Sequence, residues 1–169
     1  MNHRAKFAQE LVGVLPFSGA EILDGKTVLI TGATGLIGLT LVNALLRYGT
    51  GRENPPKVLA FVRNREKAEK IFRDIHEEQL KLLYGDIRNP IATEAPIDYI
   101  IHAASVTASK AFVSEPVETI RTAIDGTVNV LELAREKKVR SFVYLSSMEV
   151  YGAPETDEKI TEDHGTNLN

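Results

Sequence analysis

One stretch constrains the fold of this chain more than any other: residues 27–38, which read T-V-L-I-T-G-A-T-G-L-I-G. Residues 27–30 are β-branched or apolar and run directly into glycines, which is the pattern of a strand buried on both faces. The residues that follow the third glycine carry a broad apolar stripe at helical spacing as far as Gly49. The stretch therefore predicts a strand, a tight turn and a helix.

The three glycines of this turn, Gly32, Gly35 and Gly38, are spaced three residues apart. In such a unit the first glycine permits the turn, the second permits close approach to a phosphate, and the third permits helix and strand to pack. The helix N-terminus then offers unpaired N–H groups to a pyrophosphate. An ordinary strand-to-helix turn can look the same, but the predicted strand and helix on either side favour dinucleotide binding. No Lys-Ser or Lys-Thr pair follows the glycines, which disfavours a mononucleotide P-loop.

Further apolar runs predict four more strands, which alternate with helical patterns. The predicted strands are 57–62, 80–84, 97–104 and 141–146, and the predicted helices are 66–74 and a long one from Glu115-Pro116 to about Ala134. Strands that alternate with helices indicate βαβ units and a parallel sheet. We therefore predict an α/β fold of the Rossmann type: a doubly wound parallel sheet of strand order 3-2-1-4-5, with helices on both faces.

The chain divides into three parts by pattern. Residues 1–24 predict a short amphipathic helix before Pro16 and then a loop. Residues 25–152 form the predicted dinucleotide-binding domain. Residues 153–169 are polar and acidic, and we expect them to be a tail or the start of a C-terminal substrate domain.

Composition excludes several classes of function. A net charge of -3 without any run of Lys or Arg argues against a nucleic-acid partner. The chain has no Cys, and its four His are scattered without metal-ligand spacing, so we predict no disulfide, thiolate nucleophile or metal site. No apolar run has the length of a membrane span, and we expect a cytoplasmic protein without a membrane partner.

Four motifs occur in the order and approximate spacing of the extended short-chain dehydrogenase/reductases. They are T-G-x-x-G-x-x-G at 31–38, G-D-I-R at 85–88, H-A-A-S at 102–105 and S-S-M-E-V-Y-G at 146–152. More narrowly, residues 25–152 resemble the NAD-dependent epimerase/dehydratase, nucleotide-sugar branch. The resemblance implies the cofactor-binding portion of an oxidoreductase that binds NAD or NADP and acts on a nucleotide sugar.

The resemblance also implies roles for residues at the strand ends. Asp86 would accept a hydrogen bond from the adenine amino group, with Ile87 beside the ring, and we favour this over the alternative of a solvent-facing turn residue. Ala103 and Ala104 would let the dinucleotide lie over the fourth strand, or could simply pack. The complete predicted cofactor-binding set is Gly32, Thr34, Gly35, Leu36, Ile37, Gly38, Arg63, Asp86, Ile87, Ala103, Ala104, Ser105 and Ser146.

The choice between NAD and NADP depends on the end of the second strand. An acidic residue there would accept from the ribose 2′-OH of NAD, whereas Arg can pair with the 2′-phosphate of NADP. This chain has Arg63 with Arg65 and Lys67 nearby, and no acid before Glu66. The pattern favours NADP over NAD, although the same residues could be surface charges at the start of a helix.

The resemblance places two catalytic candidates after the fifth strand. Ser147 aligns with the Ser/Thr that hydrogen-bonds the reacting hydroxyl or carbonyl of the substrate, and Glu149 stands where dehydratases of the family have a catalytic acid. Met148 replaces the Asp usual in those dehydratases, and the serines could instead end a strand. The Tyr-x-x-x-Lys pair that supplies the general acid/base is absent, since no Tyr here has Lys four residues on.

We therefore expect a cofactor-binding piece of a larger enzyme that gives little or no turnover alone. The alternatives are a non-catalytic dinucleotide-binding or redox-sensing module, and a truncated scaffold whose crevice is intact but empty. Members of the family often dimerise through the long helix after the fourth strand, so a homodimer through residues 116–135 is a further expectation. In that case an apolar face between Val117 and Ala134 would be left partly uncovered in a single copy.

Overall fold

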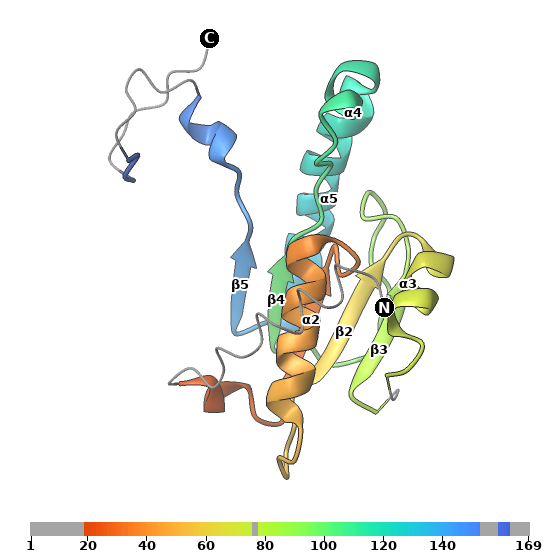
Figure 1. Cartoon of the computed structure of the whole chain (residues 1–169), viewed down its shortest axis with the longest axis vertical. Helices are drawn as coiled ribbons and strands as arrows, with labels where there is room; N and C mark the ends of the chain where they lie inside the picture. The colour runs from red at the N-terminus through yellow and green to blue at the C-terminus, as the bar shows by residue number, and fades with distance from the viewer. Residues whose placement is uncertain (1–18, 76–77, 153–158, 163–169) are drawn as a thin grey trace.

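A parallel five-stranded sheet organises the computed structural model, which describes residues 19–75, 78–152 and 159–162 (Figure 1). The strands are β1 (Thr27–Thr31), β2 (Lys57–Val62), β3 (Leu80–Tyr84), β4 (Tyr99–His102) and β5 (Ser141–Tyr144). Their order across the sheet is β3-β2-β1-β4-β5, and all pairs are parallel. The predicted fold class and strand order are confirmed.

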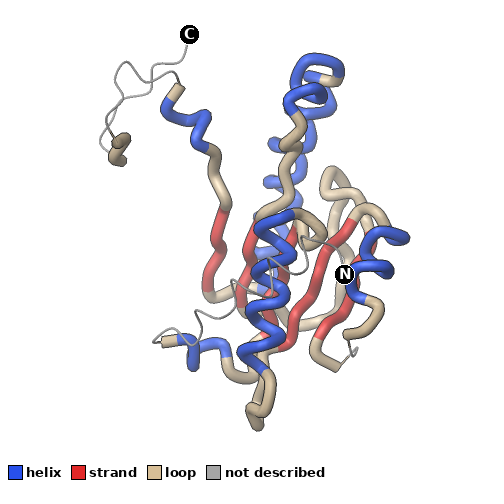
Figure 2. Tube along the Cα trace, viewed as in Figure 1, coloured by secondary structure: helices blue, strands red, loops and turns tan. Residues whose placement is uncertain are grey.

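Helices follow the strands as the alternation predicts (Figure 2). Among the described residues, the α-helices are α2 (Leu36–Gly49), α3 (Arg65–Phe72), α4 (Ser109–Ser114) and α5 (Pro116–Lys137), and the 3₁₀ helices are η2 (Ala20–Leu23) and η3 (Met148–Tyr151). The short helix α4 was not predicted, because it buries no side chain and has no capping side chain, and so carries no periodic signal. The helix predicted within residues 1–15 lies outside the described residues.

Both faces of the sheet are covered, each by its own apolar cluster. On one face α2 and α3 pack against Val28 and Ile30 of β1. On the other, α5 and the loop between β3 and β4 pack against Leu29 and Ile100. Successive strand residues point to opposite faces, so a strand with both faces covered is apolar throughout. All five residues of β1 are buried, which confirms the interpretation of its apolar run.

Two predicted strands are shorter in the structure than in the sequence pattern. The fourth was expected over 97–104 and spans Tyr99–His102, because the backbone N–H groups of Ala103 and Ala104 turn to the side-chain oxygen of Thr31. The fifth was expected over 141–146 and ends at Tyr144. It is an edge strand with mostly exposed residues, so beyond its pairing with β4 little holds the chain in the sheet.

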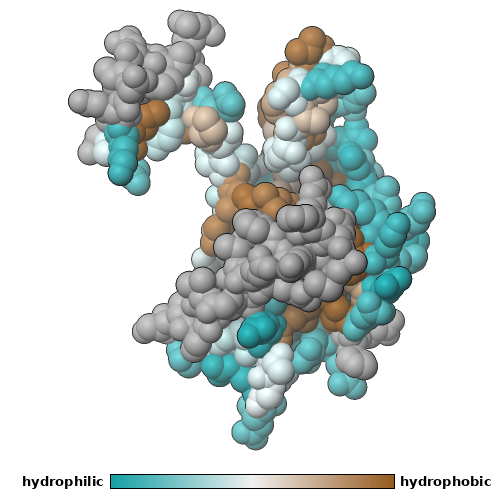
Figure 3. All heavy atoms as spheres, viewed as in Figure 1, coloured by the Kyte–Doolittle hydropathy of each residue, from teal (hydrophilic) through white to brown (hydrophobic). Residues whose placement is uncertain are grey.

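The long helix α5 has an apolar stripe that does not face the sheet. The face packed on the sheet is formed by Gly126, Val130, Leu133 and Ala134. The stripe itself remains 48–61% exposed and consists of Val117, Ile120, Ile124, Val128 and Leu131. Hydrophobic side chains are also exposed where α4 joins the start of α5 (Figure 3). The expected uncovered apolar face is therefore present on this chain.

Candidate functional site

The glycine turn between β1 and α2 is shaped by close backbone contacts. Gly32 has φ +68°, in the left-handed region that favours glycine, and a Cβ there would lie 2.6 Å from the carbonyl oxygen of Ala103. A Cβ on Gly38 would overlap the carbonyl oxygen of Gly32. The first glycine therefore permits both the turn and the close approach of β4, and the third permits α2 to pack on the turn.

The first turn of α2 is open at the same edge of the sheet. Gly35 is exposed, and within the described residues no side chain caps the helix that begins after it. Leu36 and Ile37 are more than half exposed. The first N–H groups of a helix have no partner within the helix and carry partial positive charge. This turn can accordingly receive an anionic group such as a pyrophosphate.

A buried histidine links the two central strands to α5. Thr31 and His102 are paired in the parallel register of β1 and β4, and Thr31 Oγ1 lies 2.6 Å from His102 Nδ1. The other ring nitrogen, Nε2, lies 3.3 Å from Thr127 Oγ1, whose hydroxyl donates to the carbonyl of Ala123. Thr127 is thus the acceptor, so Nε2 carries the proton and Nδ1 accepts from Thr31. Burial lowers the pKa of His102, in keeping with a neutral ring.

This network also determines where the chain leaves β4. The Thr31 oxygen accepts the N–H groups of Ala103 and Ala104, each at 3.2 Å. Two of the predicted cofactor residues, the alanines, are therefore held beside Gly32. Sequence reasoning did not single out Thr31, His102 or Thr127 as a group. The available signal was that Thr31 and His102 are the last residues of two neighbouring buried strands, where polar side chains are rare.

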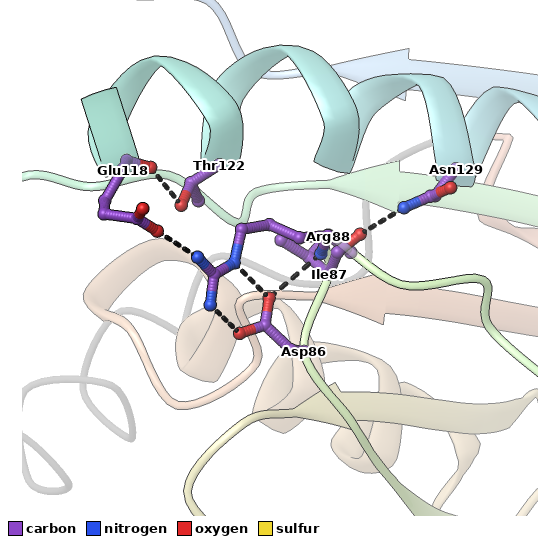
Figure 4. A network of polar contacts seen from close by, with 6 residues as sticks. All are labelled: Asp86, Ile87, Arg88, Glu118, Thr122 and Asn129. Carbon is purple, nitrogen blue, oxygen red and sulfur yellow. Dashed lines mark hydrogen bonds and ion pairs between the residues drawn. The ribbon is translucent and has the colours of Figure 1, made fainter. Parts of the chain in front are cut away.

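The loop after β3 is attached to α5 by a polar network (Figure 4). Asp86 accepts two hydrogen bonds from the Arg88 guanidinium, at 3.0 Å on Oδ1 and 2.8 Å on Oδ2, and one from the Arg88 backbone N–H at 3.0 Å. Arg88 Nη1 pairs with Glu118 of α5. The pKa of Asp86 is lowered to about 2, chiefly by the hydrogen bonds from Arg88, with a smaller contribution from the charge of Arg63.

Ile87 is fixed from the other side of this loop. Its side chain is buried and packs so closely on α5 that a Cβ at Gly126 would lie 2.9 Å from Ile87 Cγ2. The Asn129 amide donates to the Ile87 carbonyl at 2.9 Å. The sequence analysis missed Arg88, Glu118 and Asn129, because nothing in local spacing relates the loop to a helix 30 or more residues away.

The basic residues after β2 differ in their surroundings. Arg65 lies over the ring of Tyr84, 3.7 Å from its centroid, and pairs with Glu69 at 3.3 Å. Arg63 is exposed and, among the described residues, makes no ion pair, yet its charge is close enough to act on Asp86. Arg63 is therefore the residue of this group that is available at the carboxyl edge of the sheet.

The residues after β5 lie apart from the glycine turn. Ser147 Oγ accepts the N–H of Glu149 at 3.3 Å and so caps η3, and Ser146, Ser147 and Glu149 are all exposed. Figures 1 and 2 show η3 well separated from the start of α2. The structure brings the predicted cofactor residues that follow β1, β2, β3 and β4 to one edge of the sheet, but not the predicted catalytic residues. The roles of both sets stay predictions.

Two remaining residues of the predicted set are in the loops at this edge. Thr34 is half-buried within the glycine turn, and Ser105 is exposed, with its hydroxyl donating to the Val106 carbonyl at 3.4 Å. Within the described ranges, acidic and histidine side chains form no cluster that could hold a metal ion. Nor does any described helix combine the length and hydropathy that crossing a bilayer requires.

A glycine turn at the point where the strand order reverses between β1 and β4 defines a Rossmann-type domain. The chain belongs to the NAD dependent epimerase/dehydratase family, which it matches over residues 28–168.

Several similar proteins are enzymes of nucleotide sugars by name. The UDP-glucose 4-epimerase of Rickettsia rickettsii is 30% identical over 125 residues, which cover 72% of this chain and 36% of that protein. The UDP-glucuronic acid decarboxylase 1 of Danio rerio is 31% identical over 86% of this chain and 33% of its own length. The chain thus spans about a third of the length of these relatives.

Solved structures show the same fold. The UDP-glucose 4-epimerase from Bifidobacterium longum, determined in complex with NAD+ and UDP, superposes with a TM-score of 0.68 at 27% identity. The match covers 83% of this chain and 42% of that one. The structure of Pen from Bacillus thuringiensis matches with a TM-score of 0.63 at 30% identity, over 77% of this chain and 40% of that one.

Proposed function

We propose that this chain is the NAD(P)-binding domain of a nucleotide-sugar epimerase/dehydratase-like oxidoreductase. The observation that carries the proposal is the meeting, at one edge of the sheet, of the Gly32 turn, the open start of α2 and the Asp86 carboxylate. An anion site beside a fixed hydrogen-bond acceptor suits the pyrophosphate and adenine of a dinucleotide. The substrate class rests on the names of the relatives that share the family.

The residues present fit such a cofactor. A side chain on Gly32 would collide with the backbone of Ala103, so the turn needs glycine there, and Gly35 is exposed where the chain enters α2, which leaves its backbone open to a phosphate. In this arrangement Gly32, Gly35 and the first turn of α2 hold the pyrophosphate, and Asp86 with Ile87 holds the adenine. The nicotinamide, when bound, accepts or donates a hydride. The residues of this chain bind and orient that cofactor.

Arg63 gives this proposal its preference for NADP over NAD. The guanidinium follows β2 directly, is exposed, and has no ion-pair partner among the described residues. A 2′-phosphate would add a second anion beside Asp86, which the Arg63 charge can offset. Arg65 does not compete for this role, because it is engaged with Tyr84 and Glu69.

We further propose that the residues present give little or no turnover. No tyrosine here has a lysine four residues on, so a proton acceptor of suitable pKa is missing from them. Ser147 would orient the reacting hydroxyl in a complete site, with Glu149 as the acid candidate. A second candidate function is a non-catalytic dinucleotide-binding or redox-sensing module. It is favoured by the hydrogen bond with which Ser147 caps η3, because η3 is separated from the start of α2 (Figure 1).

Calorimetric titration with NAD and NADP tests the cofactor proposal. We expect both to bind, NADP more tightly, and Arg63→Ala to lower NADP affinity about tenfold while leaving NAD affinity nearly unchanged. The matched control is Arg73→Ala, whose exposed side chain, within the part of the chain that the structure describes, pairs only with its neighbour Asp74 at the far end of α3. Binding of neither dinucleotide by the wild-type chain would refute the proposal. Equal loss of both in Arg63→Ala would refute the role of Arg63.

The same preparation distinguishes the enzyme from the sensor. Steady oxidation or reduction of cofactor with UDP-glucose or UDP-glucuronic acid would contradict the expected lack of turnover. A dinucleotide affinity that differs sharply between the oxidised and reduced cofactor, without turnover, would favour the sensing module.

A further inference from the structure

We propose that Arg88 is a positioning residue that selects adenine: held by Glu118, it orients the Asp86 carboxylate so that Oδ2 keeps one acceptor site for an exocyclic amino group. The inference rests on the proposed dinucleotide function and extends it to residues outside the predicted cofactor set. Its ligand class is a nucleotide whose purine carries an amino donor at the 6-position.

The hydrogen bonds on Asp86 support this directly. An ionised carboxylate offers about four lone-pair sites. Oδ1 accepts from the backbone N–H and the Nε of Arg88, and Oδ2 accepts from Nη2 of the same residue. Among the described residues no other donor reaches Asp86, so Oδ2 retains one site. Because the side-chain contact is bidentate, the planar guanidinium also determines the plane of the carboxylate.

Glu118 keeps the guanidinium in this orientation. Figure 4 shows Arg88 lying between Asp86 and Glu118, with Nη1 directed at the carboxylate of Glu118 on the first turn of α5. An Arg side chain that contacts no partner samples many rotamers. The contacts with Asp86 and Glu118 restrict these rotamers before the ligand binds, so the site is preorganised.

The backbone of the loop is held by the same helix. Ile87 packs against Gly126, and Asn129 donates to the Ile87 carbonyl. Together with Glu118 these residues attach the loop at three levels along α5. The position of Asp86 therefore depends on a long helix that is anchored in the core by Val130 and Leu133. The low pKa of Asp86 agrees with a carboxylate that is ionised and fully occupied by donors except at one site.

If Arg88 competed with the ligand for Asp86, the predicted effect of its removal on adenine recognition would have the opposite sign. If the guanidinium merely neutralised Asp86 and competed with the ligand, its removal would free the carboxylate and strengthen recognition of the amino group. Both side chains are partly exposed, Arg88 at 37% and Glu118 at 49%, and exposed ion pairs contribute little to stability. Substitution at either position should therefore leave the fold intact and separate the two roles by the sign of the effect.

The test compares NAD with nicotinamide hypoxanthine dinucleotide, in which an oxygen replaces the 6-amino group of adenine. We expect the wild-type chain to bind NAD about tenfold more tightly, which is the contribution of one hydrogen bond to a charged acceptor. Arg88→Ala should bring this ratio close to one. Glu118→Gln should remove about half of the difference in binding free energy between the two dinucleotides. In an Asp86→Ala background, Arg88→Ala should change the ratio no further.

A second readout is independent of any cofactor. The carboxyl ¹³C shift of Asp86, followed against pH, should show its pKa rising from about 2 toward the ordinary aspartate value of about 3.9 in Arg88→Ala. The matched control is Arg135→Ala, which removes a more exposed Arg–carboxylate pair, with Glu132, from the other end of α5. Circular dichroism verifies that each variant is folded. If Arg88→Ala does not fold, the test is made with Glu118→Gln alone.

Three outcomes would overturn the inference. An unchanged ratio in Arg88→Ala or in folded Glu118→Gln would show that Arg88 does not orient Asp86 for the ligand. A larger ratio in Arg88→Ala would show that it competes. If the wild-type chain binds neither dinucleotide, the proposed function fails and the assignment of adenine falls with it. The first two outcomes leave the proposed function intact, so the two failures are distinguishable.

Discussion

Gly32 in the glycine turn should tolerate a side chain poorly, for two separate reasons. Its φ of +68° disfavours any L side chain. An added Cβ would lie 2.6 Å from the carbonyl oxygen of Ala103 and 2.8 Å from the amide nitrogen of Ala104, in the connection between β4 and α4. Both contacts are to backbone, so neither can be relieved by a rotamer change. Gly32→Ala must displace either the turn or the end of β4.

The two contributions can be separated with a second glycine. Gly51 has nearly the same backbone angle, φ +74°, but nothing lies within 4 Å of a Cβ built there. We expect Gly51→Ala to cost about 1 kcal/mol, from the left-handed conformation offset by a less flexible unfolded chain. Gly32→Ala should cost this amount plus about 1–3 kcal/mol for the steric displacement. The sum is a large fraction of an ordinary domain stability of about 5–15 kcal/mol.

Urea unfolding followed by far-ultraviolet circular dichroism gives both free energies. The quantity of interest is the difference between the two variants, in which the common cost of a positive φ cancels. A difference near zero would refute the reasoning, because it would mean that the turn and the end of β4 can separate freely. The unfolding slopes must agree between variants for the comparison to hold.

Two further predictions follow from buried and exposed parts of the same chain. Since burial lowers the pKa of His102, the unfolded chain binds more protons than the folded one below the unfolded pKa of about 6.5. The free energy of unfolding should therefore fall as pH decreases from there toward the folded pKa. His102→Gln should be less stable by about 1–3 kcal/mol and should lack that part of the pH dependence. If the free energies of unfolding of both chains, measured in urea, change in parallel from pH 8 to 5, the reasoning is contradicted. On α5 we propose a homodimer contact through the stripe of Val117, Ile120, Ile124, Val128 and Leu131, so Ile124→Glu should weaken self-association by about tenfold or more. Val113→Glu on α4, where the side chain is 85% exposed outside the stripe, is the control, and a wild-type chain that sediments as a monomer at high concentration would rule the contact out.

The predicted fold followed from features that are local in the sequence. The run 27–30 is apolar at every position because β1 has helices on both faces, and the glycines after it have spacing that only a strand-to-helix turn requires. The alternation of strands and helices then left few allowed topologies, because parallel crossovers are right-handed. The confirmed strand order is the result.

The pattern of α5 shows where local reasoning is incomplete. Its apolar period correctly predicted a helix near residues 116–134, yet that stripe faces away from the sheet, and the packed face centres on Gly126 and Val130. Periodicity reports that a helix has an apolar side, not which element covers it. The short helix α4 had no such side and could not be found this way.

The sequence by itself determined the fold class, the strand order and the glycine turn, because these depend on patterns within a few residues and on general rules of chain connection. Only the tertiary structure decided which side chains meet. Thr31 and His102 are 71 residues apart and become partners through the register of β1 and β4. Arg88 and Glu118, 30 residues apart, become partners because α5 packs against the loop after β3. Contacts of this kind depend on the simultaneous positions of several elements, and no local pattern encodes them.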